Sequence, residues 1–579
     1  LKQKMEHKNE KRICQNCKTR FTIEPDDFGF YEKIKVPPPT FCPECRYQRR
    51  IAGRNEWVLY SRTCSRCSEK MVSIYNSDYK GQVYCLKCFW SDDWDRKETG
   101  MDFDFSRPFF EQFQELRNKT PKVTVAHFRS VNSPYTNQSQ DLKNCYFTFS
   151  SDASEDCMYG NWFFGCKQSV DCSIVYRSEL IYECLDTSRC FKSTYLKDCR
   201  NCLNSHFLED CYDCQNCFGC VGLRNKSYYF FNQEITKEEY DKRINEFEWT
   251  VKNIEKTKNK LKELVLQLPQ KFYKGRSNVN STGNYIYHLK NVRLAFNSHR
   301  LENVSYSQDV STMNEGRDIT EVAYNELDYE IEGVGYGARN IAVSRSWNIY
   351  DCMYSFNCFS CDSCFGCVSL NKNKYCILNK QYSKEEYLVL KEKIIKHMQK
   401  TGEWGEFFPV DISLFSYNET VAQEYFPMNK EEVLGKGWRW YERDDRHYKV
   451  TLKSNNLPET IKETSDSVLE EIIDCVSHET EDDAKKYFNC TTAFRVTKDE
   501  LNFYRRMNLP IPHKCFMCRF QDRMRLRNPR KLWYRQCMCE KANHANHLDI
   551  RCPSEFETSY APERPEVVYC EKCYQKEIY

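Results

Sequence analysis

The middle of the chain consists of short apolar runs separated by polar residues. Runs such as Tyr146-Phe147, Trp162-Phe163-Phe164 and Ile174-Val175-Tyr176 combine aromatic and β-branched residues, which favour short strands. A ladder of cysteines recurs among these runs at steps of 12, 15, 12, 15 and 12 residues, a period of 27. The ladder consists of Cys145, Cys157, Cys172, Cys184, Cys199 and Cys211. We predict a β-solenoid whose inward row contains one of these residues per turn.

An internal repeat with an offset of 147 residues indicates a second solenoid lobe. Residues 211–240 align without gaps on residues 358–387, and 14 of the 30 positions are identical. The first four ladder cysteines align on Val292, Val304, Ile319 and Ile331. A metal ligand cannot become Val or Ile and keep its site, whereas a buried small hydrophobe can, and free Cys behaves as one. The ladder is therefore expected to be core.

An acidic or amide residue precedes each of these aligned ladder positions. Such residues suit corners, where their side chains satisfy backbone groups. The residues are Asn144, Asp156, Asp171 and Glu183 in the first lobe and Asn291, Asn303, Asp318 and Glu330 in the second.

Each lobe ends in a capping box that opens a charged helix. The boxes are Thr236…Glu239 and Ser383…Glu386. We predict that the first helix runs to about Leu268 and that the second runs to about Lys400.

Composition places the chain among intracellular multidomain proteins. Its 579 residues exceed what one core can organise, and no run of 18 apolar residues predicts a membrane span. The count of 35 cysteines is odd, and the charged start, Leu1 to Lys8, lacks the apolar core of a signal peptide. We therefore expect a reduced, cytoplasmic protein rather than a disulfide scaffold. The net charge of +3 does not point to a class of partner.

Near both ends the cysteines form C-x-x-C pairs, which are typical of zinc ribbons. Two such knuckles supply the four thiolates of a closed tetrahedral zinc site. The redox-dithiol alternative needs a βαβ context that is absent from the sequence. The N-terminal pairs predict one site from Cys14, Cys17, Cys42 and Cys45 and another from Cys64, Cys67, Cys85 and Cys88.

The C-terminal segment repeats this ribbon pair at an offset of 473 residues, with a later insertion of 12. The offset predicts a third site from Cys475, Cys490, Cys515 and Cys518, and a fourth from Cys537 or Cys539 with Cys552, Cys570 and Cys573. An acidic insertion, Glu479 to Asp483, opens the first knuckle. His544 and His547 lie in the later insertion and are candidate substitute ligands, although loop histidines are the commoner explanation. We expect about four zinc ions per chain.

The densest cysteine cluster permits two interpretations. Cys211, Cys214, Cys217 and Cys220 recur every third residue, as do Cys358, Cys361, Cys364 and Cys367. One interpretation is a metal or iron–sulfur site at the end of each lobe. The other, which we favour, is a set of packed structural thiols in a narrow final coil.

A basic segment with interleaved aromatic residues lies in the C-terminal ribbons. From Arg505 to Arg535 there are ten Lys or Arg residues and one acid. Basic residues among aromatics suit phosphate contacts with base stacking; the alternative is a solvated face that balances an acidic linker. The candidate nucleic-acid-binding residues are Arg519, Arg523, Arg525, Arg527, Arg530, Lys531, Trp533 and Arg535.

The first ribbon resembles a zinc-ribbon domain family that has no assigned activity. The residues that carry the resemblance are Cys14, Cys17, Phe21, Ile23, Phe30, Tyr31, Pro38, Cys42, Pro43, Cys45 and Arg46. The whole arrangement, including Tyr417 to Ala422, also resembles uncharacterised zinc-ribbon proteins of reduced-genome bacteria. The resemblance implies an architecture and no activity.

Together these patterns predict a mainly β, multidomain protein with tandem zinc ribbons at both ends of two β-solenoid lobes, each lobe followed by a helix. The expected order is 1–95 tandem ribbons, 96–140 helical linker, 141–235 first lobe, 236–270 helix, 271–382 second lobe, 383–400 helix, 401–470 linker and 471–579 tandem ribbons.

No nucleotide-binding or hydrolase motif is present in the sequence, and no small-molecule substrate is evident. The leading functional hypothesis is a non-enzymatic zinc protein that binds nucleic acid, with RNA or a ribosome favoured. The alternatives are a protein–protein scaffold and, more weakly, a redox or iron–sulfur protein.

Overall fold

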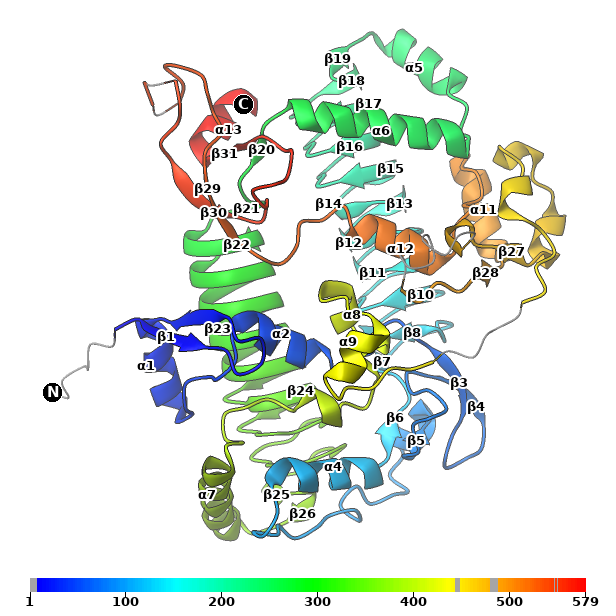
Figure 1. The fold of residues 1–579 in the computed structure, drawn as a ribbon. Helices are drawn as coiled ribbons and strands as arrows, with labels where there is room; N and C mark the ends of the chain where they lie inside the picture. The colour runs from blue at the N-terminus through cyan, green and yellow to red at the C-terminus, as the bar shows by residue number, and fades with distance from the viewer. Residues whose placement is uncertain (1–7, 443–447, 479–487, 546, 549, 579) are drawn as a thin grey trace.

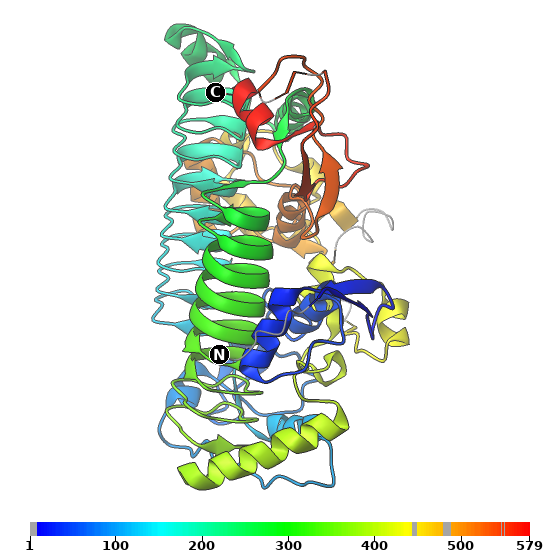
Figure 2. The same ribbon diagram turned by 90° about the vertical axis from the view of Figure 1, so that its left-hand side faces the viewer.

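Two tall stacks of short strands form the centre of the molecule (Figure 1). The computed structural model describes residues 8–442, 448–478, 488–545, 547–548 and 550–578. Strands account for 33% of the residues and helices for 25%, so β structure outweighs helix, in agreement with the predicted class. In Figure 2 the first N-terminal residues (dark blue) and the C-terminal unit (orange to red) lie on the same side of the paired stacks.

The first stack is built from parallel strands that pair at a constant sequence offset. Tyr146 of β10 faces Met158 of β11, and Asn161 of β11 faces Ser173 of β12. The strands are β8 (Thr136–Asn137), β10 (Tyr146–Phe149), β11 (Met158–Phe164), β12 (Ser173–Tyr176), β13 (Glu179–Tyr182), β14 (Leu185–Ser188), β15 (Phe191–Lys197), β16 (His206–Glu209), β17 (Gln215–Val221) and β18 (Ser227–Phe230). Antiparallel β19 (Gln233–Glu234) ends the stack.

The second stack repeats this arrangement. Tyr329 of β23 faces Ile341 of β24, at the same offset as in the first stack. Its strands are β21 (Gly275–Arg276), β22 (Val279–Tyr287), β23 (Lys290–Ala338) and β24 (Ile341–Tyr350), and β25 (Cys376–Ile377) pairs with β26 (Lys380–Gln381) at its end. The 49 residues of β23 form one continuous extended segment that winds through roughly four turns of the stack, each of which we call a coil.

Each coil has four sides of three residues. Every third residue adopts a left-handed backbone with φ between about 45° and 70°, as Asn144 (53°) and Asp318 (62°) do. The residue that follows it is buried, as Cys145 and Ile319 are. Among residues with a side chain, Asn and Asp tolerate this conformation best, which explains why they precede most of the ladder positions.

The prediction that the ladder cysteines form a single inward row is wrong. One coil spans the same number of residues as the shorter ladder step, so Cys145 and Cys157 lie in one column. The longer step adds one side and moves Cys172 to the next side of the coil. The prediction that these thiols are buried is confirmed, since Cys145, Cys157 and Cys172 are at most 1% exposed.

The cores of the two stacks differ in composition. The first is filled largely by cysteines from Cys145 to Cys220, with Leu and Ile residues between them. In the second, Val and Ile residues such as Val304 and Ile319 fill most of the length, and cysteines appear only from Cys352 onward. Cys therefore acts here as a small apolar core residue that Val or Ile can replace.

The helices follow the capping boxes, with one correction. The predicted helix after the first stack is two helices, α5 (Lys237–Glu246) and α6 (Val251–Gln267). The break occurs because Phe247 and Trp249 pack against Phe207 and Phe218 of the stack, and Thr250 then caps a new helix. Helix α7 (Lys384–Thr401) follows the second stack, close to the predicted end.

The terminal units contain short hairpins, each followed by a helix. In the N-terminal half these are β1 (Glu10–Ile13), β2 (Arg20–Ile23), α1 (Pro25–Ile34), α2 (Pro43–Ile51), β3 (Tyr60–Thr63), β4 (Lys70–Ser73), β5 (Val83–Tyr84) and α3 (Leu86–Trp90). In the C-terminal half they are β27 (Ile473–Asp474), β28 (Ala493–Phe494), α11 (Lys498–Met507), α12 (Phe516–Met524), β29 (Trp533–Gln536), β30 (Glu555–Thr558), β31 (Val568–Tyr569) and α13 (Glu571–Ile578).

Short connecting elements complete the fold. They are α4 (Phe109–Lys119), β6 (Lys122–Val123), β7 (His127–Phe128), β9 (Ser139–Gln140), β20 (Gln270–Lys271), α8 (Ala422–Tyr425) and α9 (Lys430–Gly435). The segment predicted as a linker, 401–470, is folded in its described part: residues up to 442 pack against the N-terminal unit, and Leu457, Ile461 and Val468 pack with the C-terminal unit. Tyr417 Oη, for example, accepts a hydrogen bond of 2.8 Å from Gln48 Nε2.

Candidate metal centres and the interfaces beside them

The four predicted cysteine sets are brought together in the fold. In each set the four Sγ atoms lie within 4.8 Å of one another, close enough to ligate one metal ion. The sets are Cys14, Cys17, Cys42 and Cys45; Cys64, Cys67, Cys85 and Cys88; Cys475, Cys490, Cys515 and Cys518; and Cys537, Cys552, Cys570 and Cys573. The acidic insertion from Glu479 to Asp483 lies outside the described residues.

One hydrogen bond recurs in all four units. The backbone N–H of the third cysteine donates to the Sγ of the first, at 3.2 Å from Cys42 to Cys14 and at 3.3 Å from Cys85 to Cys64. The C-terminal units repeat it at 3.2 Å, from Cys515 to Cys475 and from Cys570 to Cys537. Such bonds stabilise a thiolate, the form that binds metal.

The helices that follow the knuckles contribute in the same way. Cys42, Cys85 and Cys515 are the N-cap residues of α2, α3 and α12. A helix N-terminus favours negative charge, so these positions favour thiolates as well. The repeat of this local arrangement explains why one sequence spacing produces the same cluster several times.

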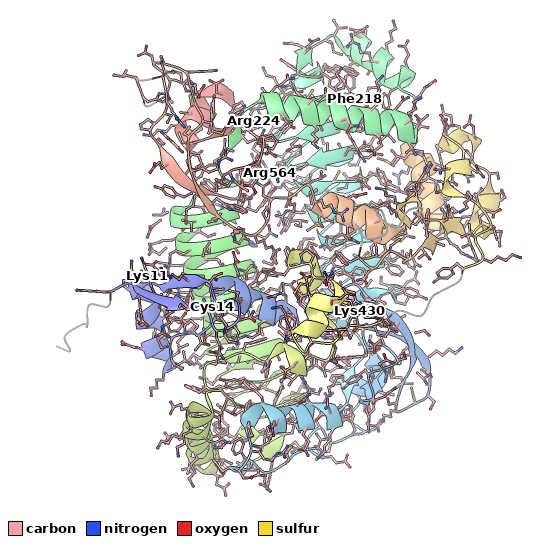
Figure 3. The ribbon with its side chains drawn as sticks, in the orientation of Figure 1. Lys11, Cys14, Phe218, Arg224, Lys430 and Arg564 are labelled. Atoms are coloured by element: carbon pink, nitrogen blue, oxygen red, sulfur yellow. The ribbon has the colours of Figure 1, made fainter. Side chains whose placement is uncertain are left out.

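The C-terminal units enclose their cysteines more completely. Cys17 and Cys67 are exposed and Cys85 is half-buried in the N-terminal units. All four cysteines of the last set are buried. Cys14 directly follows β1, and the β1–β2 hairpin carries Lys11 at the left-hand edge of the molecule (Figure 3). We expect solvent and chelators to reach the N-terminal centres first.

The structure distinguishes between the two candidates for the fourth set. Cys537 joins Cys552, Cys570 and Cys573, whereas Cys539 lies beside it in a separate group with His544, His547 and the shared Cys573. Both histidines are buried, at 6% and 8% exposure, which loop histidines on a free surface would not be. The sequence named both histidines as candidate substitute ligands for the fourth set, and the structure groups them with Cys539 and Cys573 instead.

The central cysteine clusters bond to the backbone. Cys211 Sγ donates to the carbonyl oxygens of Glu209 and Cys220, both at 3.5 Å, and Cys214 Sγ donates to Tyr212 O at 3.3 Å. Cys211 to Cys220 occupy the four successive sides of one coil. Among the described residues they do not form one of the groups whose ligand atoms converge. This favours the packed-thiol interpretation over a metal site.

The basic segment of the C-terminal unit faces inward over part of its length. Arg519 and Arg523 on α12 are 5% and 1% exposed, and Asp171 and Glu183 of the first stack lie against them. Arg519 Nε is 2.9 Å from Asp171 Oδ2, and Arg523 Nη1 is 3.3 Å from Asp171 Oδ1 and 3.5 Å from Glu183 Oε1. These two residues are therefore unavailable to phosphates in this fold, which corrects their predicted role.

The N-terminal unit docks on the second stack through the same four positions. Arg46 Nε on α2 is 2.8 Å from Asp318 Oδ2. Arg50 Nη1 is 3.2 Å from Asp318 Oδ1 and 2.9 Å from Glu330 Oε2. The arginines correspond to Arg519 and Arg523 at the ribbon offset of 473. The acids correspond to Asp171 and Glu183 at the stack offset of 147.

A buried tyrosine completes each interface. Tyr306 Oη donates to Asp27 Oδ2 at 2.8 Å, and Tyr159 Oη donates to Glu500 Oε2 at 3.0 Å. The guanidinium of Arg46 lies 4.9 Å from the Tyr306 ring centre, and that of Arg519 lies 5.2 Å from the Tyr159 ring centre. The tyrosines again differ by 147 and the acids by 473.

Charge pairing offsets the energetic cost of burying the carboxylates at these interfaces. Burial raises the pKa of Asp318 above its usual range, and the nearby guanidiniums of Arg46 and Arg50 act in the opposite direction. In the other interface, burial raises the pKa of Glu500, and the positive charge of Arg519 opposes it. Removing Arg46 or Arg519 would therefore leave these buried carboxylates with less positive charge nearby.

The remaining basic candidates divide into two groups. Arg527 and Arg530 have side chains that are 8% exposed, and they pair with Asp186 at 2.9 Å and Asp309 at 2.6 Å. The side chains of Arg525 and Lys531 are 40% and 51% exposed. Trp533 is half-buried. Arg535 Nη1 donates to Ala561 O at 3.1 Å.

The last unit also touches the far end of the first stack. Arg224, labelled in Figure 3, donates to Tyr574 Oη at 3.1 Å and pairs with Asp210 at 3.3 Å. Strand β31 pairs in parallel with β20, which leads into the second stack. This unit therefore joins one stack to the other.

Comparison with known proteins does not place the chain in a family. No protein-family model matches it, and no curated protein matches its sequence. Within the described residues, every helix is too short or too polar to cross a membrane.

Proposed function

We propose that this protein is a non-enzymatic scaffold in which zinc-binding ribbons dock on two β-solenoids and hold them in a fixed arrangement. The two strand stacks are the solenoids, and both are built from parallel coils of one constant length. The single observation that supports the proposal best is the duplicated interface, in which Arg46, Arg50, Arg519 and Arg523 are buried against acids of the stacks.

Zinc is the metal that suits these centres. Four thiolates in a tetrahedral set are the ligands of structural zinc sites, and each ion would then have every position filled by protein. A closed centre shapes the polypeptide around it and does not activate water. The metal would fix the orientation of α2 and α12, which start at the third cysteine of their sets and carry the docking arginines.

The pairing of units and stacks is crossed along the chain. The duplicated arginine interface of the unit that begins the sequence lies on the second stack, and that of the unit that ends it lies on the first, while Arg54 and Arg530 also reach the other stack. Arg50 and Glu330 differ by 280 in sequence number, and Arg523 and Asp171 differ by 352. Such long-range contacts fix the two solenoids relative to each other. The outer faces of the solenoids would then present surfaces to a macromolecular partner at a constant spacing.

Hydrogen exchange on the full chain, with and without a strong chelator, tests this scaffold. Chelation should release the amides of both ribbon pairs and of the stack residues they cover, around Asp171 and Asp318, while the stack cores stay protected. If the covered stack residues keep their protection after the metal has left, docking of the ribbons does not depend on zinc.

Nucleic acid is the second candidate partner, with weaker support. Arg525 and Lys531 remain partly exposed, and Tyr534, in the same basic segment, is 68% exposed. Such residues suit phosphate contacts and base stacking. A fluorescence titration of the intact protein with single-stranded RNA tests this candidate. RNA binding that weakens with salt and with the Tyr534→Ala substitution would support nucleic-acid binding. The absence of RNA binding at low salt would exclude it and leave the scaffold as the one proposed function.

A further inference from the structure

The insertion in the last C-terminal ribbon brings a second group of metal ligands beside the fourth cysteine set. Cys539, His544, His547 and Cys573 place their ligand atoms within 4.8 Å of one another, and all four residues are buried. A tetrahedral zinc site with Zn–S distances near 2.3 Å separates its ligand atoms by roughly 3.5–3.8 Å, which is compatible with this grouping. Cys573 belongs to both groups.

We propose that this ribbon holds two zinc ions bridged by the Cys573 thiolate. One ion takes Cys537, Cys552 and Cys570, and the other takes Cys539, His544 and His547. The chain would then bind five zinc ions rather than the four that the cysteine pairs predict. The proposal adds to the four-centre scaffold and does not depend on how the ribbons dock on the solenoids.

The backbone of the insertion is folded so as to bring the histidines back to Cys539. Its base is closed by the N–H of Cys552, which donates to the carbonyl of Cys539 at 3.0 Å. The N–H of His547 donates to the carbonyl of His544 at 3.1 Å. Asn543 and Ala545 adopt left-handed backbone conformations on either side of His544. The Nδ1 atom of His544 consequently lies 3.2 Å from Cys539 Sγ.

The second ring nitrogen of His544 contacts a carboxylate, as is common for metal-bound histidines. Its Nε2 atom is 2.9 Å from Glu577 Oε1 on α13. A ligating histidine commonly donates its second ring N–H to a carboxylate, which fixes the ring and raises the basicity of the ligating nitrogen. Glu577 is itself held by Lys541 Nζ at 2.6 Å. With Nδ1 facing Cys539 and Nε2 facing Glu577, the ring is oriented as a zinc ligand.

Electrostatics favours the second ion. Four thiolates around one Zn²⁺ carry a formal charge of −2, and a fifth buried thiolate at Cys539 would make it −3. A second Zn²⁺ bound by Cys539 and two neutral histidines reduces the total to −1. Since buried net charge is costly, the bridged pair is the less charged arrangement.

The N-terminal copy of this ribbon supplies an internal control. Cys64, Cys67, Cys85 and Cys88 form its single group, and the position that aligns with Cys539 is Arg66. The insertion is absent there, and so are the histidines. The second ion should therefore be a property of the C-terminal copy alone.

Metal analysis of the full chain tests the proposal. Purified wild-type protein should contain five zinc ions per chain, and the His544→Asn, His547→Asn double variant should contain four with its fold retained. The His513→Asn variant, at a histidine outside the group, should keep five. Four ions in both the wild type and the double variant would overturn the bridged pair and leave the four-centre scaffold intact.

Zinc X-ray absorption of the wild-type protein provides a second readout that does not require a stable variant. Imidazole scattering should accompany the sulfur shell, because two histidines bind one of the ions. A spectrum with sulfur ligands only, in protein with its full zinc content, would also overturn the proposal.

Discussion

The N-terminal unit on the second stack and the C-terminal unit on the first stack share their interfaces but not their surroundings. Arg50 with Glu330 in one interface corresponds to Arg523 with Glu183 in the other. The cores beneath differ, because Val304 and Ile319 replace Cys157 and Cys172. The comparison separates two kinds of buried residue: the charges at the interface must pair with particular partners, whereas the core residues need only fill volume.

Metal removal should have the largest effect and should separate the two ends. Structural zinc contributes roughly 10–16 kcal/mol of apparent folding free energy in isolated finger peptides. The N-terminal centres contain the exposed Cys17 and Cys67, whereas the last C-terminal set is fully buried. Under a chelator, zinc should leave the N-terminal units first. Native mass spectrometry at successive times, with hydrogen exchange to locate the loss, measures this order; simultaneous release would contradict it.

Breaking an interface pair should have the next largest effect. The Arg50→Ala substitution removes one guanidinium partner from each of the buried acids Asp318 and Glu330, which keep Arg46 and Arg49 respectively, and should destabilise by up to about 3–5 kcal/mol. Arg523→Ala should cost less, because its partner Glu183 has a side chain that is 15% exposed. Urea unfolding of the zinc-loaded chain measures both values.

The matched control for these variants is Arg525→Ala, directly after the helix that carries Arg523. Its side chain is 40% exposed and pairs at the surface with Asp522, so the change should cost below about 1 kcal/mol. Equal losses for Arg523→Ala and Arg525→Ala would mean that burial of the pair carries no weight.

A buried acid makes one position of the second stack sensitive to pH, and the aligned position of the first stack is not ionisable. Burial raises the pKa of Asp328 to about 7, while the aligned residue in the first stack is Ile181. The folded state therefore holds the proton more tightly than the unfolded chain. The resulting stabilisation is complete below the unfolded pKa near 4 and is lost as pH rises to about 7.

This loss should reach up to roughly 4 kcal/mol across that interval, and Asp328→Asn should remove it. Urea unfolding at pH 5 and pH 8 measures the change for wild type and variant. The same pH dependence in both proteins would rule out Asp328 as its origin. Ile181→Val, in the aligned position of the first stack, is the control and should leave the pH dependence unaltered.

Exchanging core residues between the stacks should have the smallest effect. Cys157→Val and Cys172→Ile place the residues of the second stack in the first, and Val304→Cys does the reverse. Each change should cost under about 1.5 kcal/mol and leave the zinc content unchanged. Thermal unfolding with metal analysis checks this; loss of zinc from Cys157→Val would show that the ladder binds metal.

The sequence predicted the four cysteine sets and the burial of the ladder, because both follow from spacing and internal repetition. The length of the coil was harder to recognise, since inward positions also hold serines. Ser151, for example, is buried and donates to Phe149 O at 2.7 Å, so polar residues obscure the three-residue period. Cys539, His544 and His547 were predicted only as alternative ligands of the fourth set, and their separate group with Cys573 was not predicted because it has no counterpart in the N-terminal copy.

The role of the arginines could not be read from local composition. A basic helix with aromatic residues has the same pattern whether it meets phosphates or buried acids. The distinguishing signal is long-range: the two repeats, taken together, pair Arg46 with Asp318 and Arg519 with Asp171. Each repeat alone identifies residues that occur in both copies, and the fold shows that the repeated arginines contact the repeated acids.

The crossed pairing of ribbons and stacks is the central claim, and zero-length cross-linking of amines to carboxylates tests it most directly. In the native chain Lys33 contacts Glu315 of the second stack. Arg506 Nη1 of the C-terminal unit is 2.7 Å from Gln168 Oε1 of the first stack. In the Arg506→Lys, Gln168→Glu variant, these two positions should therefore become cross-linked, which reports the C-terminal unit on the first stack. Mass spectrometry should find both links within one chain, and both should disappear after chelation. Links from Lys33 to the first stack, in place of Glu315, would contradict the crossed arrangement.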